Sequence, residues 1–303
     1  MKLNKSGLSL ALAVTLALGS STLAGAASQT VNVFVNGGAT ANLVDTSRSQ
    51  AVTNWGNAET SYIEVVGVGL GAGPGGRQLA KRAAVVDAYR YLAEATQGVQ
   101  VDADTTVEKL TLQNDTIRTH VSALIRGAKI VGEGLNSDGS YYVKMRMPLY
   151  GEGSLATAVL PSVTTQTPVA FPAAGSSYQG SISGNYTGLI IDARGLGLES
   201  TYAPVVYDEN DRGIYGIKNI DGDFAISHGM VEYTHNQEMV AAVAAGNSRA
   251  GANPLVVKAV RAKLGANGAT KVSAVISASD ADKVLKENER TGFLNKYAVV
   301  FEI

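Results

Sequence analysis

The clearest pattern of apolar and polar positions in the chain runs from Tyr62 to Gln97. An apolar run, residues 62–70, leads through a glycine-rich turn into an alanine-rich segment, residues 77–97. Apolar side chains recur in this segment every three or four residues, as they do on the buried face of a helix. They are Ala80, Ala84, Val85, Ala88, Tyr89, Leu92 and Ala95. The pattern predicts a strand, a turn, and a helix whose small residues let it lie close to a sheet.

Weaker patterns flank this unit. Residues 30–36 alternate apolar with polar side chains and predict a strand, whereas residues 39–60 are small and polar and are interpreted as an irregular lead-in. Gly98 is expected to stop the helix in the left-handed conformation. Residues 99–104 alternate as a strand does, and the mixed stretch 105–126 ends in a helical pattern.

Two further apolar runs, residues 129–135 and 140–147, are joined by Asn136-Ser-Asp-Gly139. An Asp-Gly pair favours a tight hairpin, and Pro148 is expected to end the second strand because it has no backbone N–H to donate. Residues 62–150 are therefore predicted to form a mixed domain, a strand-helix-strand unit with a closing β-hairpin.

The composition changes at residue 151. Residues 151–186 are rich in Gly, Ser, Thr, Ala and Pro and carry almost no charge, which predicts a partly extended linker that buries little surface. The second half, residues 187–303, contains short apolar runs at 188–194, 203–207, 213–217, 253–261, 271–277 and 296–303 and helical patterns at 235–245 and 279–291. Ser279 is the expected N-cap of the last helix and Gly292 its stop. The fold class predicted for the whole chain is α+β, with two mixed domains.

The first residues have the features of a secretory signal peptide. Lys2 and Lys5 precede an apolar run at 8–18, and small residues follow up to Ala26 and Ala27, after either of which cleavage is expected. This apolar run is too short to span a bilayer, and no later run is long enough. The expected organisation is therefore a signal peptide at 1–26, an N-terminal strand and lead-in at 27–61, and an exported protein, periplasmic or secreted, that is soluble and has no transmembrane anchor after cleavage.

Composition excludes several classes of function. The chain has no cysteine, which removes disulfides, thiolate metal sites and a cysteine nucleophile, and also the cysteine that a bacterial lipoprotein needs to carry its acyl chains. The exported protein is accordingly expected not to be lipidated. Its formal net charge is −1, so the overall charge favours neither nucleic acid nor an anionic membrane surface as a partner.

The glycine turn is the strongest candidate for a ligand site. Gly71-Ala-Gly73-Pro-Gly-Gly76 fits the spacing of a dinucleotide fingerprint between a strand and a helix, with Asp102 or Asp104 at the end of the next expected strand. Pro74, the absence of further strand-helix units and the exported location argue against nucleotide binding. A simple strand-to-helix connection is the preferred interpretation.

Two groups of polar residues resemble metal sites. His228 and His235 flank Glu232, but this order is not that of a zinc protease, and surface histidines are the default interpretation. No GxSxG motif accompanies the serines, so a hydrolase triad is not indicated.

Asp208, Asn210 and Asp211 resemble part of a calcium loop, yet no glutamate follows at the closing position of an EF-hand. A polar hairpin turn is favoured there, and calcium binding is left open. No catalytic, cofactor-binding or metal-binding residue is assigned, and no cofactor is expected.

Three segments carry a family resemblance: residues 63–69, 80–92 and 138–147. Through them residues 62–150 resemble the envelope lipoprotein family founded on a twenty-kilodalton membrane lipoprotein, whose domain also forms the N-terminal part of flagellar assembly protein T. The resemblance implies an α+β domain used for structural attachment or assembly in a bacterial envelope, without catalysis. The missing lipobox cysteine is a departure from that family, and the second half is not assigned to a family.

Two hypotheses follow. The first is a non-enzymatic envelope or flagellum-associated assembly protein that binds envelope or flagellar proteins, with homo-oligomerisation left open; an exposed strand edge or apolar patch would support it. The second is a periplasmic ligand-binding module or enzyme that uses the turn from Gly71 to Gly76 or a cleft between the two halves. A pocket lined by Asp102 or Asp104 and the amides after Gly71 would support the second hypothesis.

Overall fold

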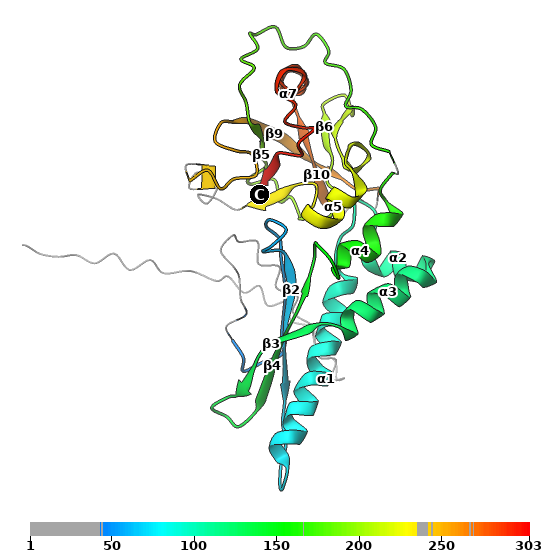
Figure 1. Cartoon of the computed structure of the whole chain (residues 1–303), viewed down its shortest axis with the longest axis vertical. Coiled ribbons are helices and arrows are strands. Elements are labelled where there is room, and N and C mark those ends of the chain that lie inside the picture. Colours follow the sequence, from blue (N-terminus) through cyan, green and yellow to red (C-terminus); the bar gives the residue numbers. More distant parts are fainter. Residues whose placement is uncertain are drawn as a thin grey trace, which may run out of the picture.

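A computed structural model of the chain describes residues 43, 45–165, 167–234, 242–243, 245–266, 268 and 270–303. The molecule has two α+β halves, as the sequence predicts, and these are stacked along its long axis (Figure 1). The expected signal peptide and the expected strand at 30–36 lie outside the described residues, so both stay predictions.

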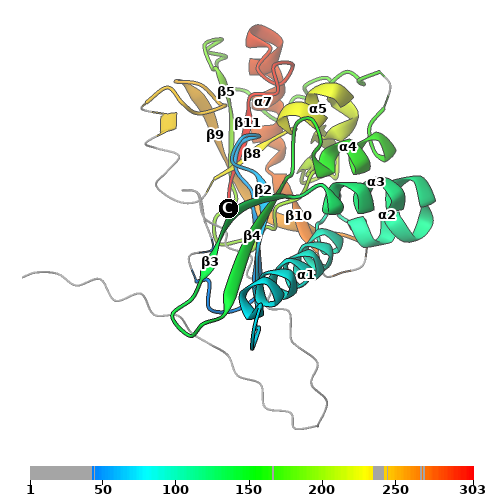
Figure 2. The ribbon, with the colours of Figure 1, turned by 60° about the horizontal axis from the view of Figure 1, so that its bottom comes forward.

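The first half is an antiparallel sheet with helices on one side. Its strands are β1 (Gln50–Asn54), β2 (Tyr62–Gly69), β3 (Lys129–Leu135) and β4 (Tyr141–Pro148), in the order β1-β2-β4-β3. The helices α1 (Gly76–Gln97), α2 (Val107–Gln113) and α3 (Asp115–Arg126) lie on the same side of this sheet (Figure 2). The predicted strand, helix and closing hairpin are thus confirmed, and the hairpin turn is closed by a hydrogen bond of 3.0 Å from Gly139 N to Asn136 O.

Close approach of α1 to β2 explains the alanine-rich face of the helix. Ala84 and Ala88 are completely buried, and they face Gly67, where an added Cβ would lie 2.2 Å from both Ala84 O and Ala88 N. Gly69 is equally tight, because a Cβ there would lie 2.1 Å from Ala80 O. Glycine on the strand and alanine on the helix therefore let the two backbones touch, which confirms the predicted packing face.

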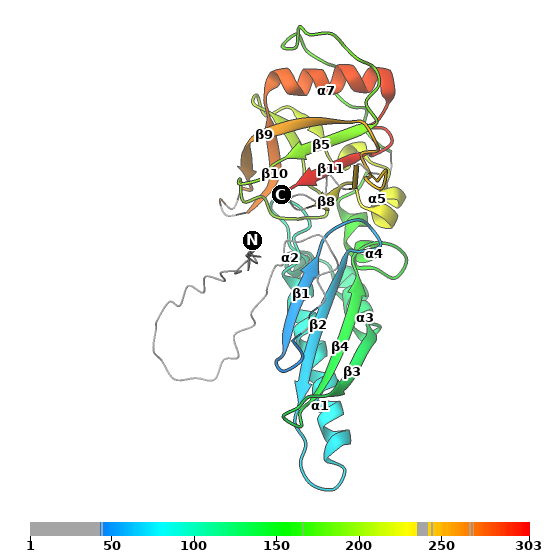
Figure 3. The ribbon, with the colours of Figure 1, turned by 90° about the vertical axis from the view of Figure 1, so that its left-hand side faces the viewer.

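The second half is a mixed sheet crossed by one long helix. Its strand order is β7-β6-β10-β9-β5-β11-β8, and α7 (Ala278–Thr291) lies across one face of it (Figure 3). The remaining strands and helices are β5 (Gly188–Asp192), β6 (Val206–Asp208), β7 (Gly213–Tyr215), α5 (Gly222–His228), β8 (Glu232–Thr234), β9 (Pro254–Leu264), β10 (Lys271–Ile276) and β11 (Val299–Glu302). A short helical turn, η2 (Ile217–Asn219), precedes α5.

Several local predictions for the first half are wrong. The lead-in contains β1, which pairs along its whole length with β2. All five of its residues are buried, so apolar and polar residues do not alternate along this strand. Residues 99–104 contribute only an isolated bridge, from Gln100 to Thr106, because the backbone turns back at once. Gly98 ends α1 with φ of −73°, an ordinary right-handed conformation that needs no glycine.

The predicted linker differs from expectation in its first part. Residues 155–162 form α4 (Leu155–Val159) and the turn η1 (Leu160–Ser162), and Leu155 and Leu160 are buried at 0% and 1% exposure. This short amphipathic segment buries apolar surface, so the prediction that the whole linker buries little is wrong. The described residues from 163 to 186 form no helix or strand and pass over α7 as an extended strap (Figure 3).

The second half differs from the sequence predictions at one helix cap and at two short elements. The N-cap of α7 is Ser277, whose hydroxyl accepts a hydrogen bond from Asp280 N, and not Ser279, which lies inside the helix. Neither α5 nor β8 was predicted, since each is short and has a mixed pattern. Most of the helix predicted at 235–245 lies outside the described residues. Gly292 stops α7 with φ of 65°, as predicted.

Candidate interaction site on the open edge of the first sheet

The strand β3 lies at one end of the first sheet. It pairs with β4, and no other strand in the described part of the chain pairs with its second side. Three apolar side chains on this strand are about half exposed: Ile130 at 47%, Val131 at 49% and Leu135 at 52%. An edge strand with free backbone groups and apolar side chains is a template for pairing with another chain, which most proteins block with charge, proline or a covering loop.

A bulge shapes this edge. Ile130 lies opposite Met145 and Gly132 lies opposite Lys144, so β3 has one residue more than β4 at this point, and that residue is Val131. A bulge bends the strand and increases its twist, and it also changes the direction of the extra side chain. Val131 consequently lines a cleft beside the edge.

This cleft lies where the end of α3 meets the first residues of β3 and the last residues of β4. Its volume is about 600 Å³, within the range of roughly 300–1,000 Å³ that ligand and peptide pockets occupy. The lining includes Tyr62, Leu124, Lys129, Val131, Arg146 and Pro148. The cleft and the open edge form one continuous surface, because Lys129 and Val131 belong to both.

A buried ion pair supports the charged wall of the cleft. Glu64 is 1% exposed and accepts hydrogen bonds from Arg146 Nε at 2.6 Å and from Leu43 N at 2.7 Å. The guanidinium of Arg146 also lies 4.1 Å from the centre of the Tyr62 ring. Burial raises the pKa of Tyr62 above its ordinary value, partly offset by the nearby Arg146. These contacts hold the guanidinium of Arg146 and the ring of Tyr62 in place in the wall of the cleft. The wall therefore offers a partner a fixed positive charge beside an aromatic ring.

The glycine turn and its predicted carboxylates lie far apart. Gly75 precedes α1 and Gly98 follows it, and a helix of 22 residues spans about 33 Å. Asp102 and Asp104 come after the far end of that helix, where Asp104 Oδ1 accepts a hydrogen bond from Ala266 N. In addition, β2 has antiparallel neighbours on both sides, whereas the dinucleotide fingerprint belongs to parallel sheets. The geometry required for the nucleotide hypothesis is absent from the described residues.

The histidine pattern is not assembled on a helix. His228 is the last residue of α5, Gly229 follows with φ of 70°, and Glu232 begins β8. Burial raises the pKa of Glu232, and the nearby Arg249 opposes this shift. His235 lies outside the described residues. No cluster of three or more potential metal ligands occurs among the residues that the structure describes.

The acidic turn between β6 and β7 is a polar hairpin turn, as favoured from the sequence. Asp208 Oδ1 accepts hydrogen bonds from Asn210 N at 2.8 Å and Arg212 N at 2.9 Å, and Arg212 Nε binds Oδ2 at 2.9 Å. Asp211 Oδ1 accepts a hydrogen bond from Lys263 Nζ at 2.8 Å. Both carboxylates thus have cationic partners from the protein itself.

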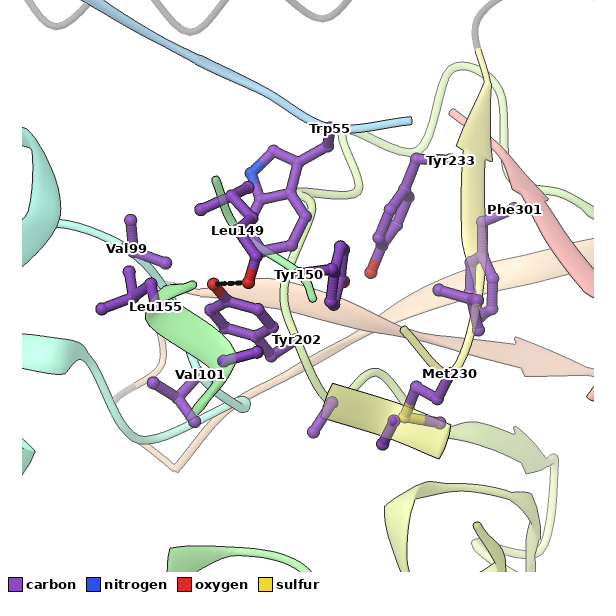
Figure 4. Close-up of a cluster of buried hydrophobic side chains, with 14 of the residues drawn as sticks. Trp55, Val99, Val101, Leu149, Tyr150, Leu155, Tyr202, Met230, Tyr233 and Phe301 are labelled. Atoms are coloured by element: carbon purple, nitrogen blue, oxygen red, sulfur yellow. Dashed lines mark hydrogen bonds between the residues drawn. The ribbon is translucent and has the colours of Figure 1, made fainter. Parts of the chain in front are cut away.

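The junction between the two halves is filled with aromatic rings (Figure 4). Trp55 from the first half packs edge-on against Tyr202 and Tyr233 from the second, with ring centroids 5.1 and 6.0 Å apart. Tyr150 completes the cluster at 5.3 Å from Tyr202. A hollow of about 200 Å³ remains beside Trp55, below the usual range for ligand pockets of roughly 300–1,000 Å³. The cleft expected between the halves is therefore mostly filled.

Sequence reasoning identified β3 as a strand but missed the cleft and the bulge. One signal was available: the pair Ile130-Val131 breaks the alternation of a half-buried strand immediately before Gly132, which is where bulges occur. The contribution of α3 to the cleft depends on tertiary packing and has no local signal.

The half of the chain that carries this edge and cleft matches a known protein family. Residues 41–146 match the LPP20 lipoprotein family. The match confirms the resemblance seen in the sequence and extends it upstream of residue 62, so that β1 belongs to the LPP20-type domain. Residues 188–302 match the second domain of Treponema pallidum Tp0624, which assigns a similarity to the half that the sequence left open. No curated protein matches the chain.

The LPP20-type domain includes all four strands of the first sheet up to Arg146, and helices α1 to α3. The open edge and most of the cleft therefore lie inside the matched region. The family description indicates an envelope lipoprotein. None of the helices within the described residues is long and apolar enough to cross a membrane.

Proposed function

We propose that this chain is a non-enzymatic structural or assembly protein of a bacterial envelope, which binds a protein partner through β3 and the adjoining cleft. The observation that carries the proposal is the open edge of β3, with Ile130, Val131 and Leu135 about half exposed. Addition of a strand to such an edge gives affinity through backbone hydrogen bonds, and a neighbouring pocket gives specificity through one anchoring side chain.

The cleft supports this mode of binding. It begins at the first residues of β3, so a partner strand laid along the edge would place one side chain in it. Lys129 on the edge is exposed, and it favours an acidic residue in the partner at this end. An enzymatic role has less support, because the glycine turn and the expected carboxylates are separated by the length of α1.

The envelope location rests on the LPP20 lipoprotein match and on the signal-peptide pattern at residues 1–26. Since the chain has no cysteine, we propose that it is exported without the acyl chains that the family name implies. Within the envelope, assembly of the flagellum is the finer proposal, and it rests on the resemblance to flagellar assembly protein T.

Site-specific photo-crosslinking in cells tests the proposed surface. A photoreactive residue at Val131 is expected to yield a crosslinked product of defined mass, and the same residue at Val256 on β9, 59% exposed, serves as the control. Proline at Ile130 should abolish the product, because an edge strand tolerates proline but loses a backbone donor. Equal crosslinking at Val131 and Val256 would contradict the proposal.

A further inference from the structure

The far end of the LPP20-type domain carries exposed leucines on a projecting loop. The loop between β2 and α1 extends beyond the hairpin between β3 and β4 (Figure 3). Leu70 on its first side is 76% exposed, Leu79 on its second side is 54% exposed, and residues 71–75 between them are exposed as well. This distal tip, residues 70–79, therefore presents apolar side chains to the outside on a convex surface.

The two leucines lie at the same level of the tip. A Cβ added at Gly71 would lie 1.9 Å from Gly76 O and 2.8 Å from Ala80 N, so the two sides of the loop touch at its base. Leu70 and Leu79 are the chain neighbours of Gly71 and Ala80. Gly73 and Gly75, with φ of 76° and 80°, make the turn without any bulky side chain of their own.

The charge of the tip is positive, unlike the charge of the whole chain. From Val65 to Val86 the sequence has three cationic residues, Arg77, Lys81 and Arg82, and no aspartate or glutamate. Of these three, Lys81 forms an ion pair with Glu133, in which Nζ lies 2.7 Å from Oε1.

 Arg77 lies against the ring of Tyr141, and both Arg77 and Arg82 are exposed. Arg77 precedes Leu79 in the first turn of α1 and Arg82 follows it by three residues, so exposed cations lie on both sides of this leucine along the helix.

We propose that the distal tip docks on an anionic phospholipid surface, with Leu70 and Leu79 in the interfacial layer and Arg77 and Arg82 among the phosphate groups. Exposed apolar side chains with exposed cations beside them at one end of a domain match the mixed apolar and anionic character of a membrane interface. A convex loop has no groove to receive a protein segment, which favours the flat lipid surface as the occupant. This attachment would need no acylated cysteine, and it does not depend on the proposed role of β3.

Vesicle co-sedimentation tests the proposal. The protein is the chain from Ala27 onward, which keeps every described residue, and the vesicles contain phosphatidylethanolamine with phosphatidylglycerol, or phosphatidylcholine alone. Binding is expected to the anionic vesicles and to weaken as salt screens the charges. The double variant Leu70→Ser/Leu79→Ser should bind at least about tenfold more weakly, since each leucine contributes through its buried methylene groups.

Matched variants separate this result from general damage. Leu112→Ser removes an equally exposed leucine, at 76%, from α2 and should bind as the parent does. Arg77→Gln/Arg82→Gln should lose the preference for anionic vesicles, whereas Arg261→Gln, which removes an exposed cation from β9, should keep it. Thermal unfolding should be unchanged in the leucine variants, because both side chains are exposed.

Two outcomes would overturn the proposal. In one, the parent binds neither kind of vesicle. In the other, the tip variants bind anionic vesicles as well as the parent. If the parent binds no vesicles and mutation of the tip removes a crosslinked protein in cells, the proposal is also overturned. The tip is then a protein-binding loop. Failure of crosslinking at Val131 would leave the vesicle result intact, so the two proposals fail separately.

Discussion

At the scale of single residues, the contact between α1 and β2 depends on glycine in the strand and alanine in the helix, whose side chains are absent or small. Ala88 is completely buried, and its backbone N lies 2.2 Å from the position of a Cβ on Gly67. An interior packed this closely cannot take extra volume without moving a backbone.

We expect Ala88→Leu to force α1 away from the sheet and to lower the free energy of unfolding by about 1–3 kcal/mol. Val86→Leu enlarges a side chain on the exposed side of the same helix, where the parent side chain is 69% exposed, and should change stability little. Thermal or urea unfolding of the two variants measures the difference. Equal stability of Ala88→Leu and the parent would refute close packing at this face.

At the scale of elements, the strap at residues 163–186 is held on α7 by carboxylates of the helix. Asp282 accepts hydrogen bonds from Gly175 N at 2.7 Å, Ser177 N at 2.8 Å and Arg212 at 2.6 Å. One turn further, Glu287 accepts hydrogen bonds from Ser183 N at 2.7 Å and Gly184 N at 2.8 Å. Burial opposes the charged form of Asp282, but these donors outweigh it and lower its pKa to about 2.

A lowered pKa means that the folded state favours the ionised carboxylate. The stabilisation is therefore complete above the ordinary pKa of aspartate, about 4, and is lost as the pH falls toward 2, with a magnitude of about 2 kcal/mol. Asp282→Asn should destabilise the chain at neutral pH by a similar amount, and its difference from the parent should shrink below pH 4. Urea unfolding at several pH values measures this dependence.

Glu289→Gln provides the control, since Glu289 is exposed on the same helix. If Asp282→Asn and Glu289→Gln have the same stability at every pH, the strap is not held by Asp282.

Regular elements with a clear period were predictable from the sequence, and contacts between distant segments were not. The alanine face of α1, the Asp-Gly hairpin and the stop at Gly292 follow from local rules, and the structure confirms them. The strand β1 was missed because both of its faces are buried, which removes the alternation on which strand prediction depends. The cleft could not be predicted, because it combines α3 with both ends of the closing hairpin.

At the scale of the whole molecule, the aromatic junction joins the two halves into one packed unit. Tyr202 is 1% exposed, packs edge-on against Trp55 and Tyr150, and donates a hydrogen bond to Leu149 O at 2.9 Å. Trp55 is the only tryptophan in the chain. Its fluorescence therefore reports on the junction alone.

We expect the parent to unfold in one transition, with Trp55 fluorescence and far-ultraviolet circular dichroism coinciding. Tyr202→Ala removes a buried ring that both halves share and should cost about 3–5 kcal/mol. Its fluorescence transition should then precede the loss of secondary structure, because the halves separate before they unfold. Tyr207→Ala, on the half-buried side of β6, is the control and should keep the two transitions together.

The length of α1 gives this junction a mechanical consequence. The helix runs from the junction to the distal tip as a rigid arm of about 33 Å, so a rotation of about 10° at its root would swing the tip through about 6 Å. The rings around Trp55 resist such a rotation, and they thereby set the reach of the arm. A substitution that loosens one ring would alter how far from the second half the arm can make contact, with no change at the tip itself.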